Sequence, residues 1–388
     1  MKPLLYLDHA ATTATDPRVL EAMLPFFSED YGNPSSLYRS AGRARQALQN
    51  ARSTVAEVLG ARPKEVVFTG CGTESDNLAI RGVALARRRQ GRHIITTPIE
   101  HSAVLQTCQQ LQQVFGYRVT YVPVDSAGMV DPDEIGRAIT PETTLISVMY
   151  ANNEVGTIQP IAEIGRIARQ RGVTFHTDAV QAGGALDLDV ERLHVDLLSL
   201  SGHKLYAPKG VGVLYVRQGT PILPTQTGGG QEFGLRSGTE NVPYAVGMAH
   251  ALRLAHDVRA SEGERLRSLR DRLIRGVLEA VPDARLTGHP TERLPGNASF
   301  CFGGLEGEAL LLRLDVAGIC ASTGSACASM EEAPSHVLTA MGIDVTEARG
   351  SLRLTLGREN DDEDVARVLG VLPRIVADLR AMSPIYAV

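Results

Sequence analysis

The chain has 388 residues, of which 43% are hydrophobic and 21% are charged, and its formal net charge is −5. Such a length exceeds what one hydrophobic core usually supports, so we expect two domains. The acidic balance lacks the electrostatic signature of a nucleic-acid-binding protein, and no apolar run reaches the length of a membrane span. The first residues lack the apolar core of a signal peptide. Five cysteines without a Cys-x-x-Cys pair favour a reducing cytoplasm, and we expect no metal site.

Strand-like and helix-like segments alternate through the first two-thirds of the chain, which is typical of an α/β protein. We expect strands over 4–7, 65–69, 94–97, 144–150, 195–200, 211–216 and 297–302. We expect helices over 17–30, 38–59, 160–171, 242–281 and 307–317. The long helix 242–281 is where we place the boundary between the two domains.

A glycine turn, Gly70-Cys71-Gly72, follows the expected strand 65–69 and opens a helix. Backbone amides at such a helix start can bind phosphate, and Thr73 and Asp76 have the spacing of a capping box. The turn lacks both the lysine of a Walker loop and the third glycine of the dinucleotide fingerprint. On the residues alone, a plain turn before a helix is the alternative.

Two short expected strands end in residues suited to catalysis, Asp178 and Lys204. An acid at a strand exit can pair with a protonated pyridine nitrogen, which pyridoxal phosphate needs to act as an electron sink. A lysine becomes a nucleophile only when its site depresses its pKa from about 10.4. On the residues alone, a helix N-cap aspartate and a solvated loop lysine are the alternatives.

The segments His-x-Asp-x-x-Gln, residues 176–181, and Ser-x-His-Lys, residues 201–204, resemble the cysteine desulfurases of the class V aminotransferase group. The resemblance extends over about residues 4–385 and implies pyridoxal 5'-phosphate as cofactor. It also implies the type I fold of such enzymes, which is α/β, with a large domain around a mainly parallel seven-stranded sheet and a smaller C-terminal α/β domain. We expect the large, cofactor-binding domain over 17–255, and the small domain from 1–16 and 256–388.

The same resemblance implies a role for each matching residue. Lys204 would carry the cofactor and remove the Cα proton, Asp178 would face the ring nitrogen, and His101 would stack on the ring and move protons. Asn153 and Arg353 would hold the substrate carboxylate. The remaining cofactor contacts would be Gly72, Thr73, Asn153, Gln181, Ser201, His203 and Thr239.

Thr239 would reach the cofactor of the neighbouring subunit, so the resemblance implies a homodimer. The chain departs from the family at two positions. His9 stands where Asn or a small residue is usual, and Phe233 stands where Arg is common.

Cys327 lies in a segment of small and polar residues, Ala321 to Ser329, which we expect to be a mobile loop over about 320–333. An exposed thiol is a reactive thiol, whereas Cys301 between Phe300 and Phe302 is typical of a core cysteine. An incidental surface cysteine is the alternative on the residues alone. The segment resembles the Ser-x-Gly-Ser-Ala-Cys loop of group I cysteine desulfurases, in which the cysteine is catalytic.

The resemblance predicts a cytoplasmic enzyme that converts L-cysteine to L-alanine and leaves a persulfide on Cys327. The sulfur would pass to an acceptor protein, such as an iron–sulfur scaffold, with tRNA thiolation or nitrogenase assembly as open alternatives. A selenocysteine lyase or an aminotransferase of the same fold is the alternative within catalysis. A scaffold or regulator without activity is the alternative outside it. No membrane or direct nucleic-acid partner is expected.

Overall fold

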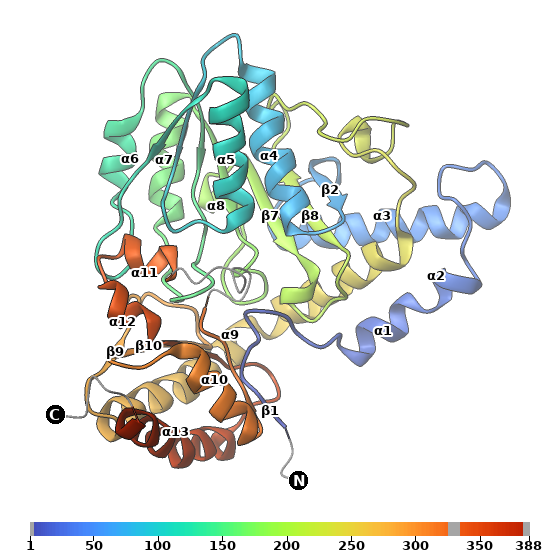
Figure 1. The fold of residues 1–388 in the computed structure, drawn as a ribbon. Helices are drawn as coiled ribbons and strands as arrows, with labels where there is room; N and C mark the ends of the chain where they lie inside the picture. Colours follow the sequence, from blue (N-terminus) through green and yellow to red (C-terminus); the bar gives the residue numbers. More distant parts are fainter. Residues whose placement is uncertain (1–3, 325–333, 383–388) are drawn as a thin grey trace.

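The computed structural model describes residues 4–324 and 334–382. Figure 1 shows a large sheet flanked by helices, with a smaller sheet and its helices beside it. The strands are β1 (Leu5–Tyr6), β2 (Val66–Thr69), β3 (His93–Thr96), β4 (Arg118–Tyr121), β5 (Thr143–Ser147), β6 (Thr174–Asp178), β7 (Leu197–Ser201), β8 (Gly212–Val216), β9 (Ala284–Leu286), β10 (Asn297–Phe302), β11 (Ile319–Cys320) and β12 (Ser351–Thr355).

The helices cover the large sheet and pack behind the small one (Figure 1). They are α1 (Pro17–Met23), α2 (Pro25–Ser28), α3 (Arg39–Leu59), α4 (Gly72–Arg87), α5 (Ser102–Phe115), α6 (Pro132–Ala138), α7 (Ile161–Arg171), α8 (Val190–Leu193), α9 (Val242–Ala280), α10 (Gly307–Val316), α11 (His336–Ala340), α12 (Val345–Arg349) and α13 (Asp362–Met382).

The large sheet has seven strands in the order β2-β8-β7-β6-β5-β3-β4. Only β8 runs antiparallel to its neighbours, so the predicted mainly parallel seven-stranded sheet is confirmed. Every residue of the central strands β5, β6 and β7 is buried, as expected for a parallel sheet covered by helices on both faces. The carboxyl ends of the parallel strands meet at one edge, where ligands of such sheets bind.

The small sheet has three antiparallel strands in the order β12-β10-β9, and β1 pairs with β11 in a separate two-stranded ribbon. The chain after β1 also touches the small sheet, because Asp8 forms a parallel bridge with Thr355. Residues 5–8 therefore lie against the C-terminal part of the chain, and the assignment of 1–16 to the small domain stays a prediction.

One helix, α9, takes part in both hydrophobic cores. Its residues up to Leu252 pack with the core of the seven-stranded sheet, and its residues from Leu269 pack with the core of the three-stranded sheet. The helix runs from one sheet to the other in Figure 1. The predicted domain boundary at 255/256 falls between these two positions and stays a prediction.

Two local predictions are wrong. The helix expected over 17–30 is divided into α1 and α2 at Pro25, because a proline has no N–H to continue a helical hydrogen-bond ladder. The capping box of Thr73 and Asp76 does not form: α4 begins at Gly72 with Cys71 as its N-cap, and Asp76 is buried within the helix. Glu74 serves this helix start instead, since its Oε2 accepts a 2.6 Å hydrogen bond from the Gly70 amide.

Candidate functional site

Asp178 is the last residue of β6 and points into the interior at the carboxyl edge of the large sheet. Its Oδ1 accepts a hydrogen bond of 2.9 Å from the Val180 amide. Burial raises the pKa of the Asp178 carboxyl, while the nearby charges of His101 and Lys204 and the Val180 amide favour its ionised form. Three predicted residues from three separate segments are thus brought within electrostatic reach of one another.

Lys204 lies three residues after the end of β7, in the short 3-10 turn Gly202–Lys204. Its Nζ donates to two backbone carbonyls of the N-terminal loop, at 2.6 Å to Ala10 and 2.8 Å to Ala11. The Gln181 side chain donates to the same Ala10 oxygen at 3.0 Å. A pocket lined in part by His9, Gln181 and Lys204 opens beside this group. The amine is therefore held at the edge of a cavity.

Gly72 brings the start of α4 against the segments that follow β6 and β7. A Cβ at position 72 would lie 2.8 Å from Val180 Cγ2 and 3.2 Å from Ser201 Cβ, so a larger residue would push these segments apart. Thr73 beside it is exposed and Ser201 is buried. A 16-residue helix with its first amides next to a hydroxyl is a suitable cradle for a phosphate.

His203 lies between Ser201 and Lys204, and its Nδ1 is 3.1 Å from the Thr12 hydroxyl. Burial lowers the pKa of His203 to about 4, and Lys204 and Lys209 add to this effect. The imidazole is therefore neutral at pH 7. It can contribute one N–H donor to an anion without adding a positive charge.

His101 is the N-cap of α5, and its Nδ1 accepts a 3.1 Å hydrogen bond from the Ala103 amide. Because Nδ1 is the acceptor, a neutral His101 ring carries its proton on Nε2. The capping role and the predicted catalytic role are compatible, since the cap fixes the ring while Nε2 retains its proton.

Arg353 on β12 reaches the same region from the three-stranded sheet. Its guanidinium is 2.8 Å from the Asp8 carboxylate and donates to the Asn153 carbonyl at 2.8 Å. The residue is 2% exposed, and its Nε is a buried donor without a partner among the residues that the structure describes. The structure thus brings together the two predicted carboxylate-binding residues, with Asp8 as a partner that the sequence did not reveal.

Cys327 lies outside the described residues, but both flanks of its segment are described. The Gly324 carbonyl accepts from Arg353 Nη1 at 3.3 Å, and the Ser335 hydroxyl donates to Glu154 Oε2. A Cβ at position 324 would lie 3.1 Å from that same Glu154 oxygen. Glu154 therefore binds the flank at Ser335 and lies close to the flank at Gly324. Cys327 is three positions after Gly324, a reach of about 10 Å for an extended chain.

Thr239 is exposed on the long loop before α9, and the structure does not bring it to Lys204 within the chain. The loop is fixed at Glu232, whose carboxylate forms a bidentate pair with Arg52 at 2.7 Å. Phe233, the second departure, lies over the same guanidinium at 4.9 Å from its ring centroid. Phe233 therefore packs over the Arg52–Glu232 ion pair and adds no charge at this position.

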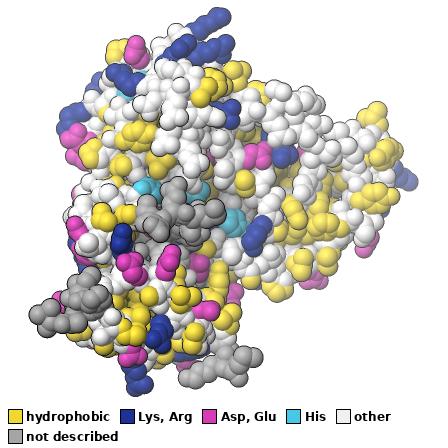
Figure 2. All heavy atoms as spheres, in the orientation of Figure 1, with side chains coloured by type: hydrophobic (Ala, Val, Ile, Leu, Met, Phe, Trp, Pro, Cys, Tyr) yellow, Lys and Arg dark blue, Asp and Glu magenta, His cyan; other side chains and the backbone are white. Residues whose placement is uncertain are grey.

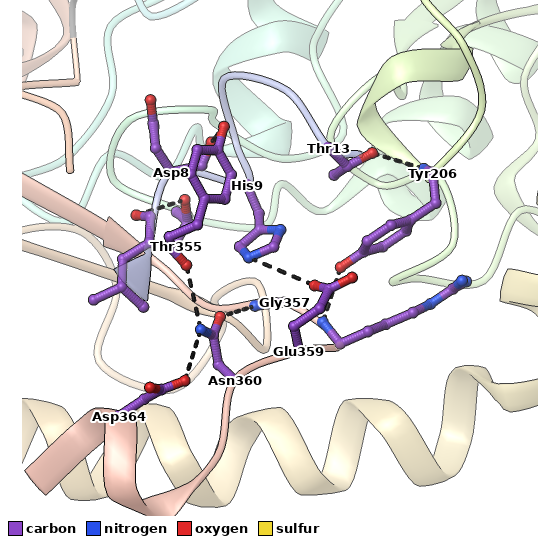
Figure 3. Close-up of polar contacts among 12 residues, drawn as sticks. Asp8, His9, Thr13, Tyr206, Thr355, Gly357, Glu359, Asn360 and Asp364 are labelled. Atoms are coloured by element: carbon purple, nitrogen blue, oxygen red, sulfur yellow. Dashed lines mark hydrogen bonds and ion pairs between the residues drawn. The ribbon is translucent and has the colours of Figure 1, made fainter. Parts of the chain in front are cut away.

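His9, the first departure, lies at the junction of the N-terminal loop with the segment after β12 (Figure 3). Its ring packs against Tyr6 at 5.0 Å and Tyr206 at 6.2 Å between ring centroids, and its Nε2 is 4.0 Å from Glu359. A Cβ at position 357 would come within 2.3 Å of the imidazole, so Gly357 makes room for this ring. Burial lowers the pKa of His9, which keeps it neutral at pH 7.

Three further buried polar residues lie behind Asp178 and were not predicted: Asp76, Glu100 and His176. They come from α4, from the connection between β3 and α5, and from β6. The sequence marks them only as acids and a histidine within apolar or turn-rich segments. Their burial follows from the packing of α4 on the sheet.

Within residues 4–324 and 334–382, no cluster of acidic, histidine or cysteine side chains has the geometry of a metal site. Over the same residues, no helix is long and apolar enough to cross a membrane.

Comparison with known proteins identifies the family of this chain. The model of the class V aminotransferase family matches residues 5–368, and the chain belongs to that family. Curated relatives carry the name cysteine desulfurase IscS. The protein of Clostridium botulinum is 50% identical over 388 residues, covering 100% of this chain and 98% of the relative. That of Methanosarcina thermophila is 53% identical over 381 residues, covering 98% and 94%.

Solved structures agree with this placement. A structure described as a NifS-like protein superposes with a TM-score of 0.91 at 41% identity, covering 97% of this chain and 100% of the other. A structure described as SspA in complex with cysteine has a TM-score of 0.80 at 38% identity, covering 91% and 98%. The predicted type I fold of pyridoxal-phosphate enzymes is confirmed.

Pyridoxal phosphate is the cofactor of this enzyme class, and the described residues fit it. The helix start at Gly72, together with Ser201 and His203, offers neutral donors for a phosphate. Asp178 offers a buried carboxylate for the ring nitrogen, and Lys204 offers the amine. The narrow space at Gly72, which a Cβ would fill, is the local feature that supports the phosphate position most directly.

Proposed function

We propose that this chain is a cysteine desulfurase that forms L-alanine from L-cysteine and carries the released sulfur on Cys327. The observation that supports this most strongly is full-length identity of about half to proteins with that name. The arrangement of Asp178, Lys204 and Arg353 supports it independently. Asp178 offers a carboxylate for a protonated ring nitrogen, Lys204 a base and Arg353 an anion anchor, and the N-terminal loop contacts both Lys204 and Arg353.

The bound cofactor would supply an electron sink next to the substrate Cα. Lys204 would hold the cofactor through Nζ and would be the base that takes the proton from the substrate Cα. Asp178 would pair with the ring nitrogen and favour its protonated form. The phosphate is held by Gly72, Thr73, Ser201, His203 and, from the partner subunit, the residue equivalent to Thr239.

Arg353 and Asn153 orient the substrate carboxylate, and Gln181 donates to the ring oxygen. Arg353 is already paired with Asp8, so the substrate carboxylate meets its unpartnered Nε or replaces Asp8. In both cases the guanidinium stays paired in a buried site, which avoids the cost of an isolated buried charge. His101 holds its proton on Nε2 above the site and passes protons to the product side.

Cys327, which lies outside the described residues, attacks the sulfur of the substrate as a thiolate. A new S–S bond forms, the Cβ–S bond breaks, and its electron pair takes a proton at Cβ. Lys204 then returns a proton to Cα, which completes alanine. The position of Gly324 beside Arg353 supports this role, since the chain enters the segment next to the carboxylate anchor. The sulfur then passes to an acceptor protein in the cytoplasm, such as an iron–sulfur scaffold.

A homodimer is part of this proposal. Large apolar side chains stand exposed over α1, α2 and the start of α3, a region where hydrophobic atoms gather in Figure 2. They are Leu20, Leu24, Phe27, Tyr31, Leu37 and Tyr38. An exposed group of this kind marks an interaction surface. We also propose that 17–255 and the pair 1–16 and 256–388 act as the two domains.

Mass spectrometry of Cys327 after mixing the holoenzyme with L-cysteine tests the activity. We expect a mass increase of one sulfur atom on Cys327 and an equal amount of alanine. Cys327→Ser should bind cofactor and substrate but release almost no sulfide. Full turnover by that variant would show a lyase that needs no enzyme thiol, and would contradict the proposal.

The dimer is tested by complementation. Neither a Thr239→Val variant nor a Lys204→Ala variant should turn over cysteine efficiently alone, but a mixed dimer should recover part of the activity at one of its two sites. Sedimentation of the wild type as a monomer would contradict a shared site.

A further inference from the structure

Two buried carboxyl groups behind Asp178 have no role in the chemistry described above. Asp76 is 1% exposed and Glu100 is 0% exposed. One oxygen of each, Asp76 Oδ1 and Glu100 Oε2, has no hydrogen-bond partner among the residues that the structure describes. A buried carboxylate without a cation costs several kcal/mol. The structure must therefore keep these groups neutral or pair them.

Asp76 faces β6 from the second turn of α4. His176 and Asp178 are two residues apart on β6, so their side chains lie on the same face of the sheet. α4 packs on this strand, and Asp76 Oδ1 is 3.7 Å from His176 Nε2. Both ring nitrogens of His176 lie 2.9 Å from serine hydroxyls, those of Ser147 and Ser199.

The 3.7 Å distance would suit an ion pair, but the burial of both groups opposes one. Burial lowers the pKa of His176 to about 3, so its ring is neutral at pH 7. Burial raises the pKa of Asp76 well above the usual range, and the charge of Asp178 raises it further. Both partners are therefore neutral, and their contact is between an acid and an uncharged ring.

The neighbouring groups favour ionisation of Asp178 over that of Asp76. His101, the Val180 amide and Lys204 all stabilise the ionised form of Asp178. The carboxyls of Asp178 and Glu100 both oppose ionisation of Asp76, and only a hydrogen bond from Ser199 favours it among the groups around that side chain that the structure describes. Glu100 comes from the β3–α5 connection, and burial raises its pKa to about 8.

We propose that Asp76 is a positioning residue that acts through Asp178: as a neutral acid packed against the strand that carries Asp178, it confines the negative charge of the cluster to the carboxyl that would meet the cofactor ring. This inference rests on the proposed role of Asp178. Helix α4 would then contribute to the site in two ways. Its first turn would hold the phosphate, and Asp76, four residues after Gly72, would keep the negative charge on Asp178.

The test compares Asp76→Asn with the wild type as holoenzymes. The absorbance of the bound cofactor and the kcat and KM for L-cysteine are followed from acidic to alkaline pH. An amide has the shape of a neutral carboxylic acid but cannot ionise. We expect kcat/KM of the variant to stay within about threefold of the wild type at neutral and acidic pH. The two pH profiles should differ only at alkaline pH, where Asp76 of the wild type can lose a proton and the amide of the variant cannot. Glu163→Gln, an exchange of an exposed acid on α7, is the control.

Three results would overturn the inference. The first is a loss of more than about tenfold in kcat/KM at acidic pH, which would show that Asp76 is normally charged. The second is coincidence of the two pH profiles throughout, which would show a purely structural residue. The third is failure of Asp76→Asn to fold, because a neutral site should accept an amide. Asp178→Asn is measured in parallel: wild-type absorbance and turnover in that variant would count against the proposed function itself.

Discussion

Lys204 and Arg353 face one substrate in the proposed reaction, but they are held in different ways. Lys204 stands in a turn next to a strand of the seven-stranded sheet, with two backbone carbonyls as its partners. Arg353 lies within a strand of the three-stranded sheet and is paired with Asp8, 345 positions away. One half of the site is built from neighbouring strand ends, and the other depends on contacts between distant parts of the chain.

The two halves of the site therefore differ in what controls them. The sheet edge contains buried acids and neutral histidines, so its charge depends on protonation. Arg353 forms a fixed ion pair, so its half depends on the positions of the paired side chains. The N-terminal loop joins them, because Ala10 and Ala11 accept from Lys204 while Asp8 pairs with Arg353.

The largest effect should come from removing the amine of the sheet edge. Lys204→Ala should lower turnover of L-cysteine by at least about 10³-fold, because the base and the point of cofactor attachment are both lost. The visible absorbance of the attached cofactor should also disappear. Lys209→Ala, an exposed lysine five residues on, is the matched control and should retain both. Equal loss in the two variants would remove Lys204 from its role.

The next effect concerns the ion pair. Arg353→Gln should raise the KM for L-cysteine and lower the free energy of unfolding by about 3–5 kcal/mol, because it leaves the Asp8 carboxylate without its partner. Adding Asp8→Asn should restore part of the stability but not the KM. If the single and double variants have the same melting temperature, the pair does not couple the two halves.

The pH dependence of stability tests the sheet edge. Burial raises the pKa of Glu100 from 4.5 to about 8, so the folded chain keeps a proton that the unfolded chain releases. Its stabilising effect is complete below the unfolded pKa and is lost as pH rises towards 8, at about 1.4 kcal/mol per pH unit. The apo protein should therefore melt at a lower temperature at pH 9 than at pH 6, and Glu100→Gln should reduce this difference. An unchanged difference would show that Glu100 is ionised in the folded chain.

His203 should affect the stability of the folded chain on the acid side of the pH range. Its pKa is lowered to about 4, so the unfolded chain takes up a proton near pH 6.5 that the folded chain refuses. This contribution is present above pH 6.5 and is lost as pH falls towards 4. His203→Gln should therefore flatten the acid side of the same melting curve.

The smallest effect concerns the ends of the Cys327 segment. Ser335→Ala removes the hydrogen bond to the Glu154 carboxylate, a contact of a kind that contributes about 1.5–3 kcal/mol, and the two that the hydroxyl accepts from the Val337 and Leu338 amides. We expect persulfide formation on Cys327 to slow by about tenfold while cofactor absorbance stays unchanged. Thr339→Val, which removes a hydroxyl that donates to the Ser335 carbonyl but keeps the Glu154 contact, is the control. Loss of the cofactor in Ser335→Ala would mean that the contact supports the whole site.

The sequence was informative where function follows from local order. Local order placed Asp178, Lys204 and Gly72 at strand exits or a helix start, and the family resemblance then supplied their predicted roles. The parallel sheet and the long helix were predicted for the same reason. The long-range partners Asp8, Asp76 and Glu100 were not, because nothing near them in the chain indicates what will cover them.

The capping-box error has the same origin. The spacing of Thr73 and Asp76 satisfies a local rule, but the helix starts two residues earlier, where Gly72 is closely packed, and Asp76 is turned towards β6. Tertiary contacts thus decided between two helix starts that the sequence allows equally.

The helix α9 limits how this chain can vary in length. Its 39 residues carry side chains of one core up to Leu252 and of the other core from Leu269. Inserting one residue in its middle would rotate the distal half by about 100° and shift it by about 1.5 Å. Asp8 and Arg353 would then be carried away from the Lys204 turn together. Surface loops can accept insertions, whereas the length of α9 fixes the relative position of the two halves of the site.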